Sequence, residues 1–279
     1  MGGGKLLRGL RNAEKALRHK PVVSAVYLFL RAAVILIMVA QFFNMNYENV
    51  FLCLLTLILF IFPTILERQL KIDFPDTLEI IIMLFIFAAE ILGEIRSYYT
   101  TFPYWDVMLH TLNGFLCAAI GFSLVDIFNR DERFSLTLSP VFMAIVAFCF
   151  SMTIGVLWEF FEYSMDRFLL LDMQKDTVVP VISSVLLDPA GGNTPVVMRN
   201  ITDVIIVTGG QQVPLGLGGY LDIGLRDTME DLFVNFIGAS VFSFIGYFYV
   251  KSRGNGRFAR RFIPQVLKEG EQKRDKTQS

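Results

Sequence analysis

Residues 105–128 read WDVMLHTLNGFLCAAIGFSLVDIF, an apolar run of membrane-spanning length that begins with two ionisable residues, Asp106 and His110. A run of about 20 apolar residues predicts a transmembrane helix. Ionisable side chains are costly in such a helix, so they are candidates for a functional site. The chain has four such pairs, each spaced by about one helical turn: Asp106 with His110, Glu90 with Glu94, Glu159 with Glu162, and Asp227 with Asp231.

The composition of the whole chain supports a membrane location. Its 279 residues are 54% hydrophobic, include 27 phenylalanines and have a mean hydropathy of +0.53. An ordinary soluble domain of this length is less apolar. The apolar runs predict six membrane spans, at 22–43, 47–66, 77–95, 106–128, 140–163 and 228–250. The predicted fold is therefore all-α and polytopic, with one six-helix transmembrane bundle.

The basic residues predict how these spans are oriented. With both termini in the cytoplasm, 19 of the 25 Lys and Arg residues lie inside and 5 lie outside, as the positive-inside rule requires. The resulting segments are a basic cytoplasmic arm (1–20), five helices (21–163), an extracytoplasmic loop (164–226), a sixth helix (227–250) and a basic cytoplasmic tail (251–279). The expected partner is the lipid bilayer, and no nucleic acid is expected.

The loop at 164–226 is long and punctuated by glycine and proline. Between its glycine clusters lies a β-branched stretch from Val196 to Val207. This pattern predicts strands, as a hairpin. We expect the loop to form a small β-containing cap over the face where the ionisable pairs converge.

In the six-span topology, all four ionisable pairs fall at the outer face of the bilayer. Helix capping explains Asp106 and Asp227, because both sit at predicted helix N-termini. It does not explain Glu159 and Glu162, which sit at a predicted helix C-terminus where the helix dipole disfavours negative charge. His110 and Asp231 lie one turn deeper than a cap reaches. Such carboxylates require a compensating arginine, a shared proton or a metal ion.

A metal site is the most specific hypothesis for these residues. Its candidate ligands are His110, Glu159, Asp227 and Asp231, and its candidate catalytic bases are Glu162 and Asp106. Glu90, Glu94 and Asn235 are further candidates. One imidazole with several carboxylates suits Mn, Fe or Zn. The EF-hand, P-loop, H-E-x-x-H and G-x-S-x-G patterns are absent from the sequence.

Small and polar residues accompany these groups along two of the spans. Asn113 and Gly114 follow His110, and Asn235 and Gly238 follow Asp231 at helical spacing. Such stripes are typical of close helix contacts in membranes. They predict that each of these two spans packs closely against another helix.

Three of these motifs also carry a resemblance to a known family. The strings Trp105-Asp106-x-x-x-His110-x-x-x-Gly114, Trp158-Glu159-x-x-Glu162 and Asp227-Thr228-x-x-Asp231 resemble the YjdF-type family of inner-membrane proteins. Asp231-Leu232-x-x-Asn235-x-x-Gly238-Ala239 is similar to the closing motif of VanZ-like membrane proteins. The resemblance implies a location in the bacterial cytoplasmic membrane and supplies no reaction.

Three classes of function are compatible with these observations. The first is a metal-assisted hydrolase or transferase that acts on a lipid or envelope substrate at the outer face. The second is an ion- or proton-coupled transporter that uses the carboxylates as a relay. The third is a structural or regulatory membrane protein whose polar residues only hold the bundle together.

Overall fold

The computed structural model describes residues 20–70, 72–130, 138–252 and 256–266. The predicted basic arm, apart from Lys20, and the end of the predicted tail lie outside these residues. The chain divides into two compact units. Unit 1 comprises residues 1–154 and 234–279, and unit 2 comprises residues 155–233. Each unit is described by itself.

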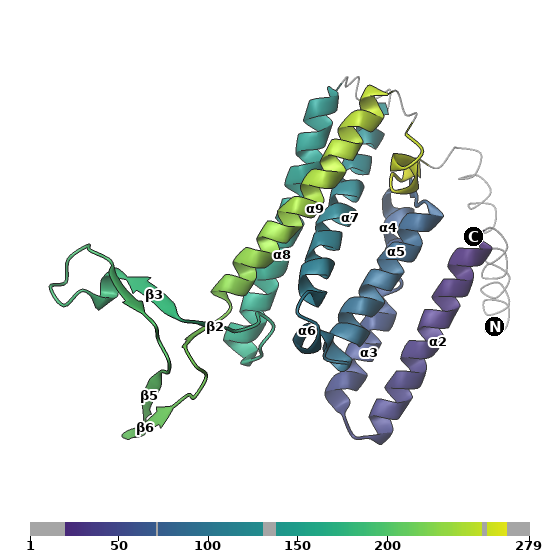
Figure 1. Ribbon diagram of the computed structural model, residues 1–279. Coiled ribbons are helices and arrows are strands. Elements are labelled where there is room, and N and C mark those ends of the chain that lie inside the picture. The colour runs from purple at the N-terminus through teal and green to yellow at the C-terminus, as the bar shows by residue number, and fades with distance from the viewer. Residues whose placement is uncertain (1–19, 71, 131–137, 253–255, 267–279) are drawn as a thin grey trace. The chain divides into compact units, whose positions relative to one another are not determined.

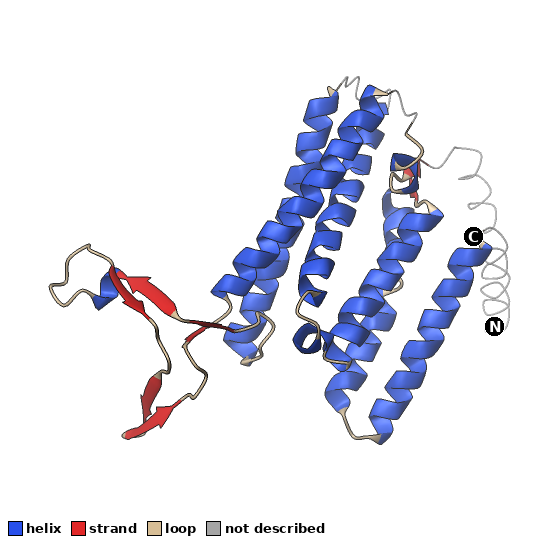
Figure 2. Cartoon of the chain, viewed as in Figure 1, coloured by secondary structure: helices blue, strands red, loops and turns tan. Residues whose placement is uncertain are grey.

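Unit 1 is built of helices that lie side by side (Figures 1 and 2). Contacts join α2 to α3 and α5, and α5 to α7. The helices are α2 (Pro21–Phe43), α3 (Tyr47–Leu59), α4 (Phe62–Leu70), α5 (Asp76–Phe87), the π-helix η1 (Ala88–Ile95), α6 (Tyr98–Thr101) and α7 (Trp105–Arg130). Two long helices, α8 (Pro140–Leu169) and α9 (Leu225–Lys251), contribute residues to both units.

Five helical segments of the described chain are long and apolar enough to cross a membrane. They are Pro21–Phe43, Tyr47–Glu67, Trp105–Asn129, Pro140–Leu169 and Leu225–Lys251. The predicted count of six is therefore not confirmed. The residues of the remaining predicted span, 77–95, form α5 followed directly by η1, so the helix changes its hydrogen-bonding pattern partway along this run.

The backbones of α7 and α9 approach closely at two glycines in unit 1. A methyl group added at Gly114 would lie 2.2 Å from the carbonyl oxygen of Asn235, and one at Gly238 would lie 2.0 Å from that of Thr111. Asn113 Nδ2 donates a hydrogen bond to Asn235 Oδ1 at 3.3 Å. Ser151 Oγ on α8 donates to the Gly114 carbonyl at 2.7 Å. The predicted packing of the two stripes is confirmed.

Part of the predicted C-terminal tail is folded onto unit 1. The 3₁₀ helix η3 (Ala259–Arg261) leads into strand β8 (Gln265–Val266), which pairs antiparallel with β1 (Ile72–Asp73). Phe262 and Ile263 are buried between these elements and join the core of unit 1. The tail is thus more than a basic extension, because its apolar residues anchor it to the bundle.

A lysine ties the start of α2 to the same region. Lys20 Nζ donates to the Phe74 carbonyl at 2.7 Å and lies 2.9 Å from Asp73 Oδ1 and 3.2 Å from Glu79 Oε2. Partial burial disfavours the charged form, but the hydrogen bond to Asp73 and the charges of Glu79 and Asp73 outweigh it. The pKa of Lys20 is raised as a result.

Unit 2 contains the end of α8, the start of α9 and the β-rich segment between them. Its strands form three separate antiparallel pairs. These are β2 (Thr177–Val179) with β7 (Tyr220–Asp222), β3 (Val181–Ser184) with β4 (Val196–Arg199), and β5 (Ile205–Thr208) with β6 (Gln211–Pro214). The 3₁₀ helix η2 (Val185–Leu187) follows β3.

The predicted strands between α8 and α9 are confirmed, in an arrangement richer than one hairpin. The β-branched stretch from Val196 to Val207 is divided between β4 and β5, which belong to different pairs. Gly209 and Gly210 have φ of 57° and 77° and join β5 to β6. Two successive residues with positive φ are what a two-residue turn of type I′ requires.

The close contact between α7 and α9 gives a testable expectation. Replacing Gly114 with Ala places a methyl group against the backbone of Asn235, which cannot move aside as a flexible side chain could. We expect the substitution to lower the free energy of unfolding by about 1–3 kcal/mol, the usual cost of overpacking. Thermal unfolding of the purified protein in lipid nanodiscs measures the change.

Gly256→Ala is the matched control. A methyl group there would lie 3.5 Å from its nearest neighbour, a ring carbon of Tyr249, which is ordinary contact distance. Equal unfolding temperatures for the two variants would contradict the proposed contact. Alanine has a higher helix propensity than glycine, which by itself would stabilise the Gly114→Ala variant. A loss of stability in that variant therefore reports the clash.

Candidate functional site

Three buried carboxylates converge in unit 2. Glu159 and Glu162 lie one turn apart on α8, and Asp231 lies on α9. Their residues are 4%, 8% and 3% exposed. Each residue offers one carboxylate oxygen, and these three atoms all lie within 4.8 Å of one another. We call this group the carboxylate triad. The structure thus brings together three of the residues that the sequence selected.

One argument for selecting Glu159 and Glu162 was wrong. They were expected at a helix C-terminus, but α8 continues to Leu169. Glu162 therefore lies about two turns before the end, whereas the dipole effect is confined to the last turn. Phe168 and Leu169 extend the helix beyond the predicted boundary at 163. The case for the two glutamates now rests on their burial and on their convergence with Asp231.

Electrostatic repulsion within the triad is substantial when all three groups are ionised. Two unit charges 4.8 Å apart repel by about 3 kcal/mol at an effective dielectric constant of about 20. Three such pairs are present in the triad. A positively charged side chain, a shared proton or a bound cation can offset this repulsion.

A short segment bridges the ends of α8 and α9 in unit 2. We call residues 172–176 the strap. The backbone N–H groups of Met173 and Gln174 donate to the Asp166 carboxylate on α8 at 2.6 and 2.8 Å. The N–H of Lys175 donates to Asp227 Oδ2 on α9 at 2.8 Å. The side chain of Gln174 also bonds to the hydroxyl of Thr228. The strap therefore holds the two helix ends together.

Asp227, a predicted metal ligand, lies in the first turn of α9 and contacts the strap. Its Oδ2 accepts the hydrogen bond from the strap, it is not one of the three triad residues, and its role as a metal ligand stays a prediction. The N-terminal turn of α9 receives a cap from Asp222, whose Oδ2 accepts from the N–H of Arg226 at 2.8 Å. In the same region, partial desolvation and the charges of Asp172, Asp166 and Asp222 raise the pKa of Asp176.

Three residues of this arrangement were missed from the sequence: Asp166, Gln174 and Asp222. Asp222 precedes the first residue of α9 by three positions, and an Asp just before an apolar helix is a recognised capping signal. The sequence gives no such signal for Asp166 and Gln174. Asp166 accepts from backbone N–H groups of the strap, and the Gln174 side chain bonds to a hydroxyl that is distant in sequence.

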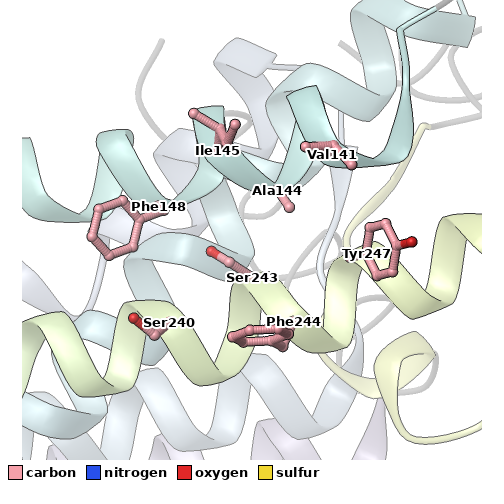
Figure 3. Close-up of a pocket in the computed structure, with 8 residues that line it drawn as sticks. All are labelled: Val141, Ala144, Ile145, Phe148, Ser240, Ser243, Phe244 and Tyr247. Atoms are coloured by element: carbon pink, nitrogen blue, oxygen red, sulfur yellow. The ribbon is translucent and has the colours of Figure 1, made fainter.

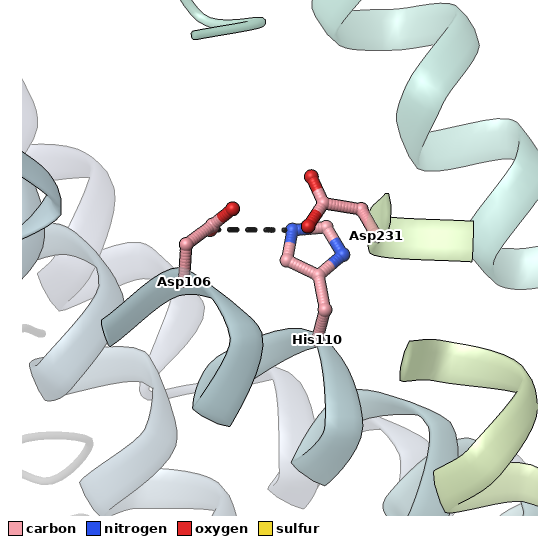
Figure 4. Close-up of side chains that lie close together, drawn as sticks. All are labelled: Asp106, His110 and Asp231. Atoms are coloured by element: carbon pink, nitrogen blue, oxygen red, sulfur yellow. Dashed lines mark ion pairs between the residues drawn. The ribbon is translucent and has the colours of Figure 1, made fainter. Parts of the chain in front are cut away.

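Asp106 and His110 form their own pair in unit 1. Both lie on α7, in its first two turns, and His110 Nε2 lies 3.5 Å from Asp106 Oδ1 (Figure 4). Asp106 belongs to the first turn of α7, where the helix dipole stabilises a negatively charged carboxylate.

Asn235, a further candidate, is buried and bonds to Asn113. Its contacts are those of a packing residue.

Glu90 and Glu94 lie on the π-helix η1 in unit 1. Between them, Gly93 is packed against the ring of Tyr99, where an added methyl group would lie 2.3 Å from a ring carbon. Segments of π-helix are rare and are frequent at functional sites. Glu90 and Glu94 are not members of a candidate metal-binding group among the described residues.

A groove of about 340 Å³ lies between α8 and α9 in unit 1 (Figure 3). Its lining is apolar apart from two serines and the hydroxyl of a tyrosine, and it contains no ionisable carboxylate. The residues are Val141, Ala144, Ile145, Phe148, Ser240, Ser243, Phe244 and Tyr247. Apart from the phenol of Tyr247, this groove therefore offers no titratable side chain of its own.

Comparisons with known proteins agree with these observations. An uncharacterized protein of Thermotoga maritima is 26% identical over 108 residues, which is 38% of this chain and 53% of that protein. The matched part thus spans about half the length of this relative. No solved structure gives a significant match. The resemblance to VanZ-like proteins stays a prediction.

The family model described as "Predicted membrane protein (DUF2238)" matches residues 26–189, which is more than half of the chain. This match is consistent with the resemblance to the YjdF-type family. The matched region includes Asp106, His110, Glu159 and Glu162, and it extends through the strap. The chain belongs to the DUF2238 family of predicted membrane proteins.

Proposed function

We propose that the carboxylate triad binds a divalent metal ion and that the protein is a metal-assisted hydrolase or transferase. The observation that supports this proposal is the convergence of Glu159, Glu162 and Asp231, all buried, within 4.8 Å. One divalent cation at the centre of the triad offsets the repulsion among all three groups at once. Its substrate is a lipid or an envelope component at the outer face of the membrane.

The ligand atoms of the triad suggest which metal binds. Carboxylate oxygens suit hard ions such as Mg²⁺ and Mn²⁺, whereas Zn and Fe favour an added imidazole. We therefore assign Mn²⁺ from the predicted set of Mn, Fe and Zn. Ions of this kind are commonly held by one or two carboxylates and keep several bound waters.

The three carboxylates then take different roles. Glu159 and Asp231 would hold the metal ion, and Glu162 would act as the general base. A metal ion lowers the pKa of its bound water and so supplies a nucleophile at neutral pH. A base within hydrogen-bonding reach of that water completes the reaction centre. The predicted roles of His110 as a ligand and Asp106 as a base stay predictions.

We further propose a bacterial cytoplasmic membrane location with six spans and both termini in the cytoplasm. Five spans are the long apolar helices, and the sixth is the continuous run of α5 and η1. The basis is the split of 19 basic residues inside against 5 outside. In this topology the triad and the strap lie at the outer face.

Reporter fusions test the proposed topology. A reporter active only in the cytoplasm should be active when fused after Ser279, and a reporter active only after export should be active near Gly192. An exported-only reporter that is active after Ser279 would contradict the six-span arrangement. Expression of each fusion, measured by immunoblotting, controls for unequal protein levels.

Metal binding is tested with purified protein in nanodiscs. Addition of Mn²⁺ at about 100 times its dissociation constant should stabilise the wild-type protein by about 2.7 kcal/mol. Glu159→Gln and Asp231→Asn should each weaken Mn²⁺ binding by at least about tenfold, because each removes a charged ligand. Calorimetric titration and thermal unfolding, with and without a chelator, measure both effects.

Glu230→Gln is the control for these substitutions. Glu230 precedes Asp231 on α9, is exposed and pairs with Arg226 at 2.8 Å, so its loss should change stability little and leave Mn²⁺ affinity unchanged. The metal site would be overturned if Mn²⁺ and chelator leave the unfolding temperature of the wild-type protein unchanged while a lower pH raises it. Shared protons would then offset the repulsion within the triad.

Catalysis is tested separately from binding. Wild-type protein loaded with Mn²⁺ is incubated in vesicles of bacterial polar lipids and cell-envelope precursors, and the products are followed by mass spectrometry. We expect turnover that Glu162→Gln lowers by about 100-fold or more, the usual contribution of a general base. Binding of Mn²⁺ without any turnover would leave the metal site standing and would contradict the enzymatic role.

A further inference from the structure

The hairpin formed by β5 and β6 is exposed on both of its faces. All eight residues of the two strands are exposed. Successive residues of a strand point to opposite faces, so Ile205 and Val207, which are 57% and 68% exposed, lie on one face and Ile206 lies on the other. An isolated two-stranded hairpin is at best marginally stable in water. Figure 2 shows this hairpin as a ladder separate from the β3–β4 pair.

The two outer edges of this hairpin differ in what they offer to another strand. The pairs are Thr208 with Gln211, Val207 with Gln212, Ile206 with Val213, and Ile205 with Pro214. The pair that closes a two-residue turn is hydrogen-bonded, and hydrogen-bonded pairs alternate with non-hydrogen-bonded pairs. The N–H and C=O groups of Ile205 and Val207 on β5 therefore point outward. The bond from Leu215 N to the Val204 carbonyl, at 2.9 Å, fits this alternation.

The outer edge of β6 is the poorer template. Its outward residues are Gln212 and Pro214, and proline has no N–H group to donate. The edge of β5 retains both donors and both acceptors. A partner strand would therefore pair with β5 and leave β6 at the edge of the new sheet, which is the position that proline tolerates.

The β5 edge of the hairpin also lacks the features that usually prevent pairing between strand edges. Natural edge strands carry charged residues or proline that block association. Here no charged residue occurs from Val204 to Leu221. An uncharged edge pairs with its own copy without repulsion between like charges, and antiparallel pairing of identical strands satisfies a twofold axis.

We propose that the partner of this edge is a second copy of the chain, with β5 of one copy paired antiparallel to β5 of the other. The result is a four-stranded sheet in the order β6, β5, β5 of the partner, β6 of the partner. Such a sheet reaches the strand number at which independent stability becomes possible. The membrane favours this assembly, because copies held in one bilayer share an orientation and a raised effective concentration.

Two proline substitutions test the proposal with matched local effects. Val207→Pro and Gln212→Pro replace the two members of one non-hydrogen-bonded pair, so each removes an outward N–H and leaves the β5–β6 ladder intact. Only Val207→Pro removes a donor from the proposed interface. Single-molecule photobleaching in dilute liposomes counts the copies in each assembly. We expect dimers for wild type and Gln212→Pro, and at least a tenfold weaker dimer for Val207→Pro.

Several outcomes would overturn the proposal. A monomeric wild-type protein would do so, and so would equal dimer stability for both variants, which would place the interface elsewhere. The lipid bilayer is the competing occupant, and the hairpin would then dock onto it. Such docking is detected when Ile206→Trp, made in a variant whose Trp105 and Trp158 are replaced by Phe, is quenched by brominated lipid in a monomeric protein. Circular dichroism and thermal unfolding of both variants verify that they are folded.

Discussion

Repulsion among three buried carboxylates is the constraint on which the ends of α8 and α9 in unit 2 depend. Glu159 and Glu162 belong to one helix and Asp231 belongs to the other, so ionised side chains would push the two helices apart. The strap acts against this, since its backbone donates to Asp166 on α8 and to Asp227 on α9. Those hydrogen bonds are to charged acceptors, which are the stronger kind. The strap and a bound cation would thus stabilise the same pair of helix ends.

The packing of α7 against α9 shows a different way to hold membrane helices together. Lipid is as apolar as the side chains, so close backbone contact and interhelical hydrogen bonds replace the hydrophobic effect. Gly114 and Gly238 provide the contact, and the Asn113–Asn235 bond provides the polar link. Asn235 thereby combines burial with a satisfied amide. Its position one turn after Asp231 on α9 explains why sequence spacing alone grouped it with the ionisable residues.

Much of the fold could be predicted from periodic features of the sequence. Long apolar runs identified the five long helices, and small residues at helical spacing identified the α7–α9 contact.

The change to π-helix at Ala88 could not be predicted, because it leaves the apolar pattern of 77–95 unaltered. The end of α8 at Leu169 was missed because the charged and polar residues after Glu162 resembled the end of a span. The division of Val196 to Val207 between two hairpins depends on partners distant in sequence. Within the triad, the residues were predictable from their cost in a membrane, whereas the strap that holds their helices was not.

Anomalous scattering tests most directly whether a metal ion occupies the carboxylate triad. Crystals grown with MnCl₂ and measured above and below the manganese absorption edge should show one strong anomalous peak between the carboxylates of Glu159 and Asp231. The same crystals of Asp231→Asn should lack it. A map of the wild-type protein with ordered carboxylates and no peak at the triad would contradict the claim.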